Sequence, residues 1–327
     1  MPMRQLSIWA VLGIWASICV GGALYGLWEG YGGRAFAVTM TSFAILLLVM
    51  LAFAARGVAD SLAAKFGAAG GFLLGACVFV IFVMYLAGTG TFALQRALAM
   101  AAFVFVPLGL AASAKGAAVG TWQDFLTVAG IWVFVKFGPR GWMWPYHGES
   151  LSKPFTVLMA LNVALATFLL LRRAKGVGYS IGWGKRWGLY VLGSFVLFGC
   201  IAIPLGIALK FIAFEPQDVH WRGALLGTLG ILVFTAWPEE LLFRGLLQNF
   251  LSRASKSDFA GWWTASMLFG MSHITNLLHF PNWKYVVLAA LAGLFYGWTW
   301  KKTGSIFPSA LVHAAVDITW HFLFRTI

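Results

Sequence analysis

The sequence has 327 residues, of which 61% are hydrophobic and only 10% are charged, and its mean hydropathy is +0.85. Soluble domains carry about 25% charged residues, so this composition excludes an ordinary soluble protein and predicts a polytopic membrane protein. The net charge of +13 comes from basic residues scattered over the predicted loops, which indicates contact with anionic membrane lipid. The chain contains no basic patch with interleaved aromatic residues, so nucleic acid is not predicted as a partner.

Apolar runs that are long enough to cross the hydrocarbon core as helices recur along the chain. They predict an all-α transmembrane bundle of ten or eleven helices, because one run, near 118–137, is weaker and is interrupted by Asp124. The other ten runs lie near residues 6–28, 35–55, 68–89, 97–114, 154–171, 187–211, 223–243, 258–277, 284–300 and 305–324. The first run lacks a small-residue cleavage site, so it is predicted to be a helix rather than a removable signal peptide.

The orientation of the bundle follows from the Lys and Arg residues of its loops. With eleven helices and a cytoplasmic N-terminus, 13 of the 23 Lys and Arg residues fall in inside loops, nine fall in outside loops, and Arg244 lies within a span. With ten helices the N-terminus would lie on the other side, so its side stays open. The short loops and the Leu- and Ala-rich helices are typical of a protein of the bacterial inner membrane.

The three cysteines and the loop at 138–153 concern the organisation of the chain. Cys19, Cys77 and Cys200 all lie within predicted spans at no metal-ligand spacing, so they are interpreted as small packing residues. The loop is rich in aromatic anchors and marks a boundary between two parts. We predict an N-terminal transmembrane region, 1–150, without an assigned role, and a catalytic region, 151–327.

Three of the ten acidic residues lie within predicted spans: Glu239, Glu240 and Asp317. Each charge placed in the bilayer costs roughly 2.5–3.5 kcal/mol on insertion scales, so such residues indicate function. Glu240 and Arg244 are four residues apart on one helix face and are predicted to pair, whereas Glu239 is rotated about 100° away from Glu240. Glu240 is therefore interpreted as a structural carboxylate, which leaves Glu239 for chemistry. A purely structural cluster of Glu239, Glu240 and Arg244 that holds the helices together remains an alternative.

Histidines accompany these acids on two further predicted helices. The stretch "LFGMSHITN" places His273 inside a helix, and "LVHAAVDITWH" places His313, Asp317 and His321 along one stripe at spacings of four. A single intramembrane histidine is more often a hydrogen-bonded core residue. Together, however, these groups supply a base, its partner and donors for a developing oxyanion. The other three histidines, His147, His220 and His279, lie in loops or at helix ends and receive no role.

Three motifs in this region carry a family resemblance. "EELLFR" fits EExxxR, "FGMSH" fits FxxxH with Phe269 and His273, and "HAAVD" fits HxxxN/D. In this order, on late transmembrane helices, they resemble the CAAX-protease and bacteriocin-processing family of intramembrane endopeptidases. That family includes the type II CAAX prenyl proteases (the Rce-type enzymes) and the abortive-infection proteins. The resemblance covers roughly residues 185–325.

The resemblance implies a proteolytic site whose substrate is a peptide or a membrane protein. Glu239 and His273 would activate a water for attack on a peptide carbonyl, and His313 and Asp317 would form or support the oxyanion site. Glu240 and Arg244 would hold the site together. Asp317 stands where the prenyl proteases commonly have Asn. We predict that it orients His313 and stabilises its cationic form, rather than acting as a protonated donor.

The sequence leaves open whether the site holds a zinc ion, and it allows two other classes of function. Because the chain has no HExxH motif, a metal-free site without a cofactor is predicted. The alternative is a zinc ion held by Glu239, His273 and His313. A proton-coupled transporter would use the same buried groups as a relay, although the inverted repeats of such proteins are not detected. A non-catalytic scaffold or immunity protein with a degenerate site is the third alternative.

Overall fold

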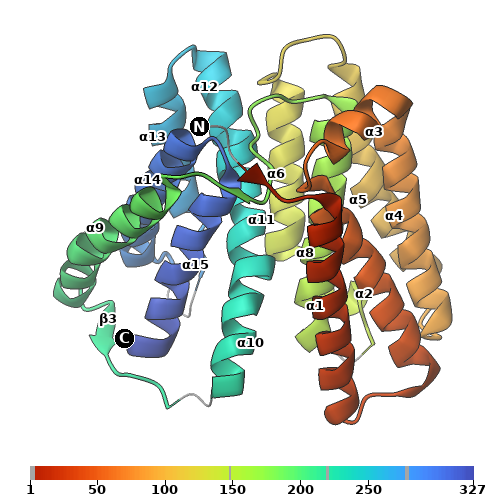
Figure 1. The fold of residues 1–327 in the computed structure, drawn as a ribbon, viewed down its shortest axis with the longest axis horizontal. Coiled ribbons are helices and arrows are strands. Elements are labelled where there is room, and N and C mark those ends of the chain that lie inside the picture. The colour runs from red at the N-terminus through yellow and green to blue at the C-terminus, as the bar shows by residue number, and fades with distance from the viewer. Residues whose placement is uncertain (1–3, 147–148, 219–220, 277–279) are drawn as a thin grey trace. The chain divides into compact units, whose positions relative to one another are not determined.

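A computed structural model describes residues 4–146, 149–218, 221–276 and 280–327 and is almost entirely helical (Figure 1). Eight helices within these described residues are long and apolar enough to cross a membrane, which confirms the all-α, polytopic membrane fold. The chain divides into two compact units. The N-terminal unit is Gln5–Lys175, and the C-terminal unit is Gly176–Ile327 together with Arg4. The assignment of the chemistry to residues 151–327 stays a prediction.

The N-terminal unit is a helical bundle built around its last helix. In the most apolar stretch of Ser152–Leu171, 89% of the residues are buried, whereas in that of Ile8–Trp28 only 6% are buried. The last helix therefore forms the core, and the first lies at the edge. The helices are α1 (Ile8–Trp28), α2 (Gly33–Phe53), α3 (Val58–Phe66), α4 (Ala69–Gly88), α5 (Leu94–Ser113), α6 (Trp122–Phe137), α7 (Arg140–Met143), α8 (Glu149–Ala164) and the π-helical η1 (Leu165–Leu171). The short strand β1 is Arg4–Gln5.

Helix α6 corrects the expectation that Asp124 interrupts a span. Asp124 lies in the first turn of α6 and forms a capping box with Thr121, whose backbone N–H donates to its carboxylate at 3.1 Å. Arg172 then binds the same carboxylate through two nitrogens, at 2.8 and 2.9 Å. The acid therefore begins the helix and is neutralised there, since its ligands satisfy both the charge and the helix terminus.

The C-terminal unit contains the helices predicted to carry the chemistry. In chain order its elements are β2 (Gly182–Trp183), α9 (Trp187–Ala208), β3 (Ile212–Phe214), α10 (Trp221–Ile231), η2 (Leu232–Ala236), α11 (Trp237–Glu240), η3 (Leu241–Gln248), α12 (Asn249–Ser255), α13 (Asp258–Met271), α14 (Trp283–Thr303), α15 (Ile306–Leu323) and β4 (Phe324–Thr326). Helix α14 packs on α13 and α9, and α15 packs on α9, α14, η2 and α11. Strands β3 and β4 pair antiparallel.

The elements from α10 to α12 form one continuous helix of 35 residues, Trp221–Ser255. The prediction ended this helix near residue 243. In the structure Arg244 and Gln248 are buried and bonded, Arg244 to Glu240 and Gln248 to the carbonyl of Gly297, so they continue the helix inside the unit. Its 35 residues would span about 52 Å at the α-helical rise of 1.5 Å per residue, and somewhat less because η2 and η3 are π-helical, which still exceeds the roughly 30 Å hydrocarbon core. Glu239 lies near its middle.

The position of α15 is set by the chain segment before β2. Gly178 has φ +72° and lies so close to the end of α14 that a Cβ there would come within 2.5 Å of the Gly304 carbonyl oxygen. Its own carbonyl accepts a hydrogen bond from the Ile306 N–H at 3.0 Å, while Ser305 caps the helix. Only glycine tolerates both the positive φ and the close approach. The contact fixes the start of α15, two turns before His313.

Helix α13 ends earlier than predicted, and His273 lies beyond it. The helix ends at Met271, and residues 272–275 form a turn. The hydroxyl of Ser272 donates to the Phe269 carbonyl at 2.7 Å, and His273 Nδ1 lies 2.8 Å from the same oxygen. Side chains of the turn thus satisfy a carbonyl that a continuing helix would have used. The prediction that His273 is inside a helix was wrong.

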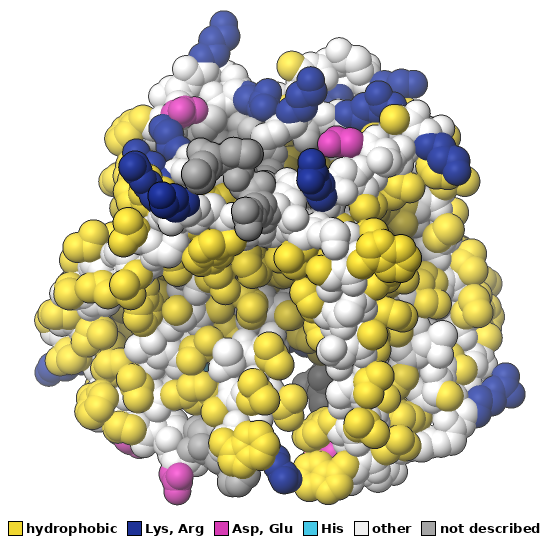
Figure 2. All heavy atoms as spheres, in the orientation of Figure 1, with side chains coloured by type: hydrophobic (Ala, Val, Ile, Leu, Met, Phe, Trp, Pro, Cys, Tyr) yellow, Lys and Arg dark blue, Asp and Glu magenta, His cyan; other side chains and the backbone are white. Residues whose placement is uncertain are grey.

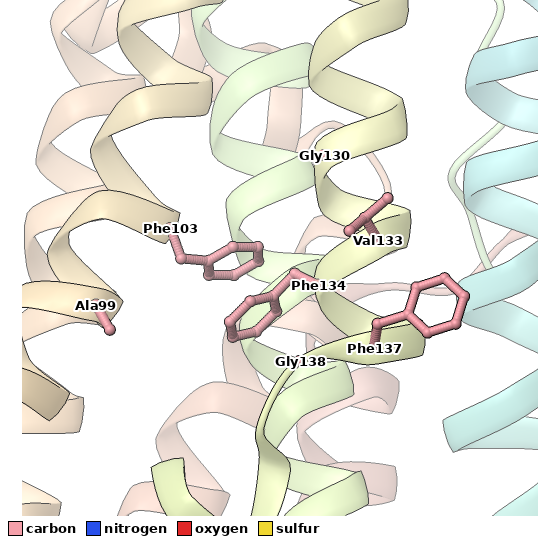
Figure 3. Close-up of a pocket in the computed structure, with 7 residues that line it drawn as sticks. All are labelled: Ala99, Phe103, Gly130, Val133, Phe134, Phe137 and Gly138. Atoms are coloured by element: carbon pink, nitrogen blue, oxygen red, sulfur yellow. The ribbon is translucent and has the colours of Figure 1, made fainter.

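The surface agrees with a membrane environment. Hydrophobic side chains cover the flanks of the helices, and Lys and Arg side chains gather beyond the hydrophobic region (Figure 2). Large apolar residues are widely exposed, for example Leu189 at 71% and Val106 at 63%, which water would disfavour but lipid does not. An apolar surface pocket lies between α5 and α6 (Figure 3), lined by Ala99, Phe103, Gly130, Val133, Phe134, Phe137 and Gly138. It contains no ionisable side chain, so it offers no acid–base chemistry.

Candidate active site

Six side chains of the C-terminal unit form one cluster of contacts: Glu239, Glu240, Arg244, Ser309, His313 and Asp317. The carboxylate of Glu240 lies at its centre and is fully buried. Its Oε2 accepts hydrogen bonds from Arg244 Nε, at 3.2 Å, and from the Ser309 hydroxyl. Its Oε1 lies 3.0 Å from Nδ1 of His313. The predicted pair of Glu240 and Arg244 is therefore present, and a histidine and a serine join it. With three donors around it, this carboxylate is compensated despite its burial.

Arg244 is held by aromatic rings as well as by Glu240. Its side chain is fully buried, and its Nη1 and Nη2 have no hydrogen-bond partner among the described residues. Its guanidinium carbon lies 5.0 Å from the ring centre of Phe269 and 6.0 Å from that of Tyr296. A cation over ring faces gains electrostatic stabilisation that offsets part of the missing hydrogen bonding. The phenylalanine of the FxxxH motif thus supports the arginine of the EExxxR motif.

His313 is oriented on both of its ring nitrogens. Nδ1 faces Glu240, while Nε2 lies 3.9 Å from Glu239 Oε2 and 3.5 Å from Asp317 Oδ2. The imidazole stacks on the ring of Tyr296 at 4.6 Å and 18°. It is 3% exposed, so its rotamer is set by packing as well as by hydrogen bonding. The ring therefore presents Nε2 toward two carboxylates.

The side chains that bear these two carboxylates are partly exposed, although the Oε2 of Glu239 that faces His313 is buried. The side chain of Glu239 is 32% exposed and that of Asp317 is 29% exposed, whereas Glu240 is at 0%. The rotation of about 100° between Glu239 and Glu240 thus separates a partly exposed side chain from a buried one. Asp317 contacts His313 directly, as the spacing of four predicts. His321, further along the same stripe, is exposed and packs on Phe322 instead.

His273 joins the cluster through Phe269. Its ring lies 4.8 Å from that of Phe269 and 4.8 Å from that of Tyr285, and Phe269 in turn contacts His313 at 5.6 Å. One aromatic ring therefore contacts both histidines. Because the Phe269 carbonyl can only accept, Nδ1 of His273 is the donor at 2.8 Å. Nε2 of a neutral His273 is then the nitrogen that accepts a proton.

The donor set does not match a zinc site. Among the described residues, no group of three or more His, Cys, Asp and Glu side chains is arranged to hold a metal ion. Glu239, His273 and His313 are thus not placed as three ligands of one zinc. No step proposed below uses a metal.

We predict that strong chelators leave the activity intact. Since the described side chains form no three-ligand group, prolonged treatment with a chelator should change the rate of peptide cleavage less than twofold. Elemental analysis of the purified protein should find far less than one zinc per chain. About one zinc per chain, with activity lost on removal and regained on addition of zinc, would restore the alternative with Glu239, His273 and His313 as ligands.

The sequence analysis missed Ser309 and Tyr296. Ser309 lies four residues before His313, so extending the stripe of His313 and Asp317 backward by one turn points to it. Tyr296 lies on α14 and carries no such signal. Both are almost fully buried, at 0% and 1% exposed, and both contact the residues of the motifs.

Comparisons with known proteins support the resemblance drawn from the motifs. Residues 221–319 match the family model described as "Type II CAAX prenyl endopeptidase Rce1-like". The match begins at the first residue of the long helix and includes every motif residue. A search of curated proteins and a search of solved structures found no match. Residues 221–319 of this integral membrane protein are therefore similar to the Rce1-like family of type II CAAX prenyl endopeptidases.

Proposed function

We propose that this protein is an intramembrane endopeptidase that hydrolyses a peptide bond of a membrane-associated substrate. The observation that carries the proposal is the meeting of Glu239, Asp317 and Nε2 of His313 within the residues that match the Rce1-like family, near the middle of a helix longer than the bilayer is thick. The catalytic region is residues 151–327, and the membrane is the bacterial inner membrane. The match to an endopeptidase family favours proteolysis over a proton relay built from the same groups.

Glu239 and His273 are the proposed activators of the attacking water. The side chain of Glu239 is partly exposed, and because its Oε2 is buried, Oε1 is the oxygen proposed to meet the water. Glu239 accepts a proton from the water, and the water oxygen attacks the carbonyl carbon. His273, whose Nδ1 donates to the Phe269 carbonyl, offers Nε2 to the same water. The proton then passes to the leaving amine as the carbon–nitrogen bond breaks.

His313 and Asp317 are the proposed oxyanion site. A protonated Nε2 of His313 donates to the oxygen that becomes negative in the tetrahedral intermediate. The carboxylate of Asp317, 3.5 Å from that nitrogen, favours the imidazolium by electrostatic attraction. Glu240 supports the same charge from the other side of the ring, at Nδ1. Glu240 and Arg244 otherwise hold the helices that carry these groups.

Asp317→Asn should lower the rate of cleavage without removing it. The amide keeps the shape and a hydrogen-bond partner for His313 but loses the negative charge. Removing an oxyanion donor outright costs about 10²–10³ in rate, so the Asn variant should lose less than this and His313→Ala at least as much. Cleavage rates measured against pH test the assignment. A fully active Asn variant with an unchanged acidic limb contradicts it and favours a protonated Asp317 as donor.

The proposed function is tested with a library of membrane peptides. The purified protein, reconstituted in liposomes, is incubated with the library, and cleaved bonds are identified by mass spectrometry. Prenylated and unprenylated versions of each C-terminal tail show whether the lipid is required. Glu239→Ala should yield no products. Proton-driven solute flux in the same liposomes, with no cleavage by the wild type, would instead support the transporter alternative.

A further inference from the structure

Ser309 contacts Glu240 of the cluster but has no role in the proposed reaction. Its side chain is fully buried on α15, one turn before His313. Its hydroxyl contacts Oε2 of Glu240 and lies 2.8 Å from the carbonyl oxygen of Tyr296 on α14. It therefore touches the carboxylate that contacts His313 and the backbone of the residue on which His313 stacks. Both of these groups, Glu240 and Tyr296, contact the imidazole of His313.

The hydrogen bonds around Glu240 divide between its two oxygens. Oε2 receives Ser309 and Arg244 Nε, while Oε1 faces His313 Nδ1. Ser309 has a single hydroxyl proton and two acceptors, Oε2 of Glu240 and the Tyr296 carbonyl. The carboxylate is charged and is therefore the stronger acceptor of the two. With two donors on Oε2, the carboxylate plane is fixed and Oε1 is directed at the histidine.

This arrangement decides which nitrogen of His313 carries its first proton. A neutral imidazole has one N–H, and the hydrogen bond made by one nitrogen sets the role of the other. When Oε1 of Glu240 binds the Nδ1–H, Nε2 is left to face Glu239 and Asp317. If the carboxylate could rotate, either nitrogen could hold the proton, because Nε2 also has carboxylate neighbours at 3.5 and 3.9 Å.

We propose that Ser309 is a positioning residue, which, through Glu240, holds the first proton of His313 on Nδ1, so that Nε2 takes the second proton, the one that the proposed oxyanion site donates. Its consequence for cleavage rests on the proposed function, but its effect on His313 does not. Tyr296 supports the same orientation by stacking, which holds the ring plane. The hydroxyl of Ser309 adds what stacking does not provide, which is the choice between the two nitrogens.

The test is nitrogen NMR of ¹⁵N-histidine-labelled protein in detergent. The sequence has six histidines, and the His313 signals are assigned by their loss in His313→Gln. In the wild type Nδ1 should carry a slowly exchanging proton. In Ser309→Ala that proton should exchange about tenfold faster or more, the change that corresponds to losing one hydrogen bond to a charged group, roughly 1.5 kcal/mol. At a pH high enough for His313 to be neutral, the second tautomer should also appear. Ser309→Thr, which keeps the hydroxyl, should restore the wild-type signals.

Ser194→Ala is the matched control. Ser194 is another buried serine of the same unit, at 1% exposed, and its hydroxyl bonds to Thr299 Oγ1 at 2.7 Å, away from the cluster. Its loss should leave the His313 signals unchanged. Wild-type signals in Ser309→Ala, or the same change in Ser194→Ala, would overturn the proposal. Should the alanine variant not fold, Ser309→Cys, with a weaker donor of similar size, takes its place.

Cleavage by the same variants separates this inference from the proposed function. Ser309→Ala should lower kcat about tenfold with little change in KM, since the substrate does not touch a buried serine. If the wild type cleaves nothing, the endopeptidase proposal fails while the NMR result still decides the role of Ser309. If the wild type cleaves and Ser309→Ala matches it in both rate and NMR signals, only the positioning role fails.

Discussion

Glu239→Gln is expected to remove peptide hydrolysis and to leave the fold intact. Positioned general bases contribute about 10²–10⁴ in rate, and glutamine keeps the shape of the side chain while losing the ability to accept the water's proton. The fold should survive because Glu239 is partly exposed and its buried neighbour, His313, keeps the carboxylates of Glu240 and Asp317. Initial cleavage rates and thermal unfolding in detergent measure the two effects separately.

Glu215→Gln is the control for this substitution. The same change is made at an exposed side chain of the C-terminal unit, which pairs with Arg325 at 2.7 Å. Exposed ion pairs contribute about 0–1 kcal/mol, so both rate and stability should stay near those of the wild type. A Glu239→Gln protein that retains the wild-type rate within threefold would exclude Glu239 as the base.

Glu240→Gln and Arg244→Ala are expected to damage folding or expression, whereas Glu239→Gln should remove activity and leave the fold intact. Each leaves its partner as an uncompensated buried charge, which costs about 3–5 kcal/mol. Glu240→Gln also removes the charge next to Nδ1 of His313, so any protein that folds should cleave more slowly. The fraction of monodisperse protein after graded heating gives the stability. Glu239→Gln serves as the reference from the same helix.

Arg172→Ala gives this prediction a second control in the N-terminal unit. Arg172 also neutralises a buried carboxylate, that of Asp124, and should lower stability by a similar amount. It lies in the other unit, so protein that remains folded should cleave at the wild-type rate. Equal losses of stability in Glu239→Gln, Glu240→Gln and Arg244→Ala would contradict the separation of a chemical from a structural glutamate.

Contacts within one helix could be predicted from the sequence, and contacts between helices could not. The spacing of four gave the contacts of Glu240 with Arg244 and of His313 with Asp317, because helix geometry sets which residues share a face. The bond between Glu240 and His313 joins residues 73 apart. Periodicity shows which face each residue occupies, but not which nitrogen meets which oxygen. The stacking of Tyr296 on His313 is equally a property of the packed helices.

Helix ends were the other limit of the sequence analysis. Hydropathy located the helices well, because an apolar run of about 20 residues has few other uses. It failed where polar residues have partners inside the protein. Gln248 continues the long helix because the carbonyl of Gly297 accepts its amide, and His273 leaves α13 because Phe269 supplies an acceptor. Both outcomes depend on groups far away or on side-chain capping, which a hydropathy average does not contain.

The ion pair of Asp124 and Arg172 has a consequence for the synthesis of the chain. At 16 residues, or about 24 Å, α6 is shorter than the roughly 30 Å hydrocarbon core. Asp124 lies in its first turn, and its basic partner, Arg172, is made 48 residues after it. At 5–20 residues per second a ribosome needs about 2–10 seconds to make that segment. During this interval α6 has an uncompensated charge at its start. We therefore expect α6 to reach its native position only after Arg172, which follows the helix of Ser152–Leu171, has been made, so that the order of translation contributes to how this unit assembles.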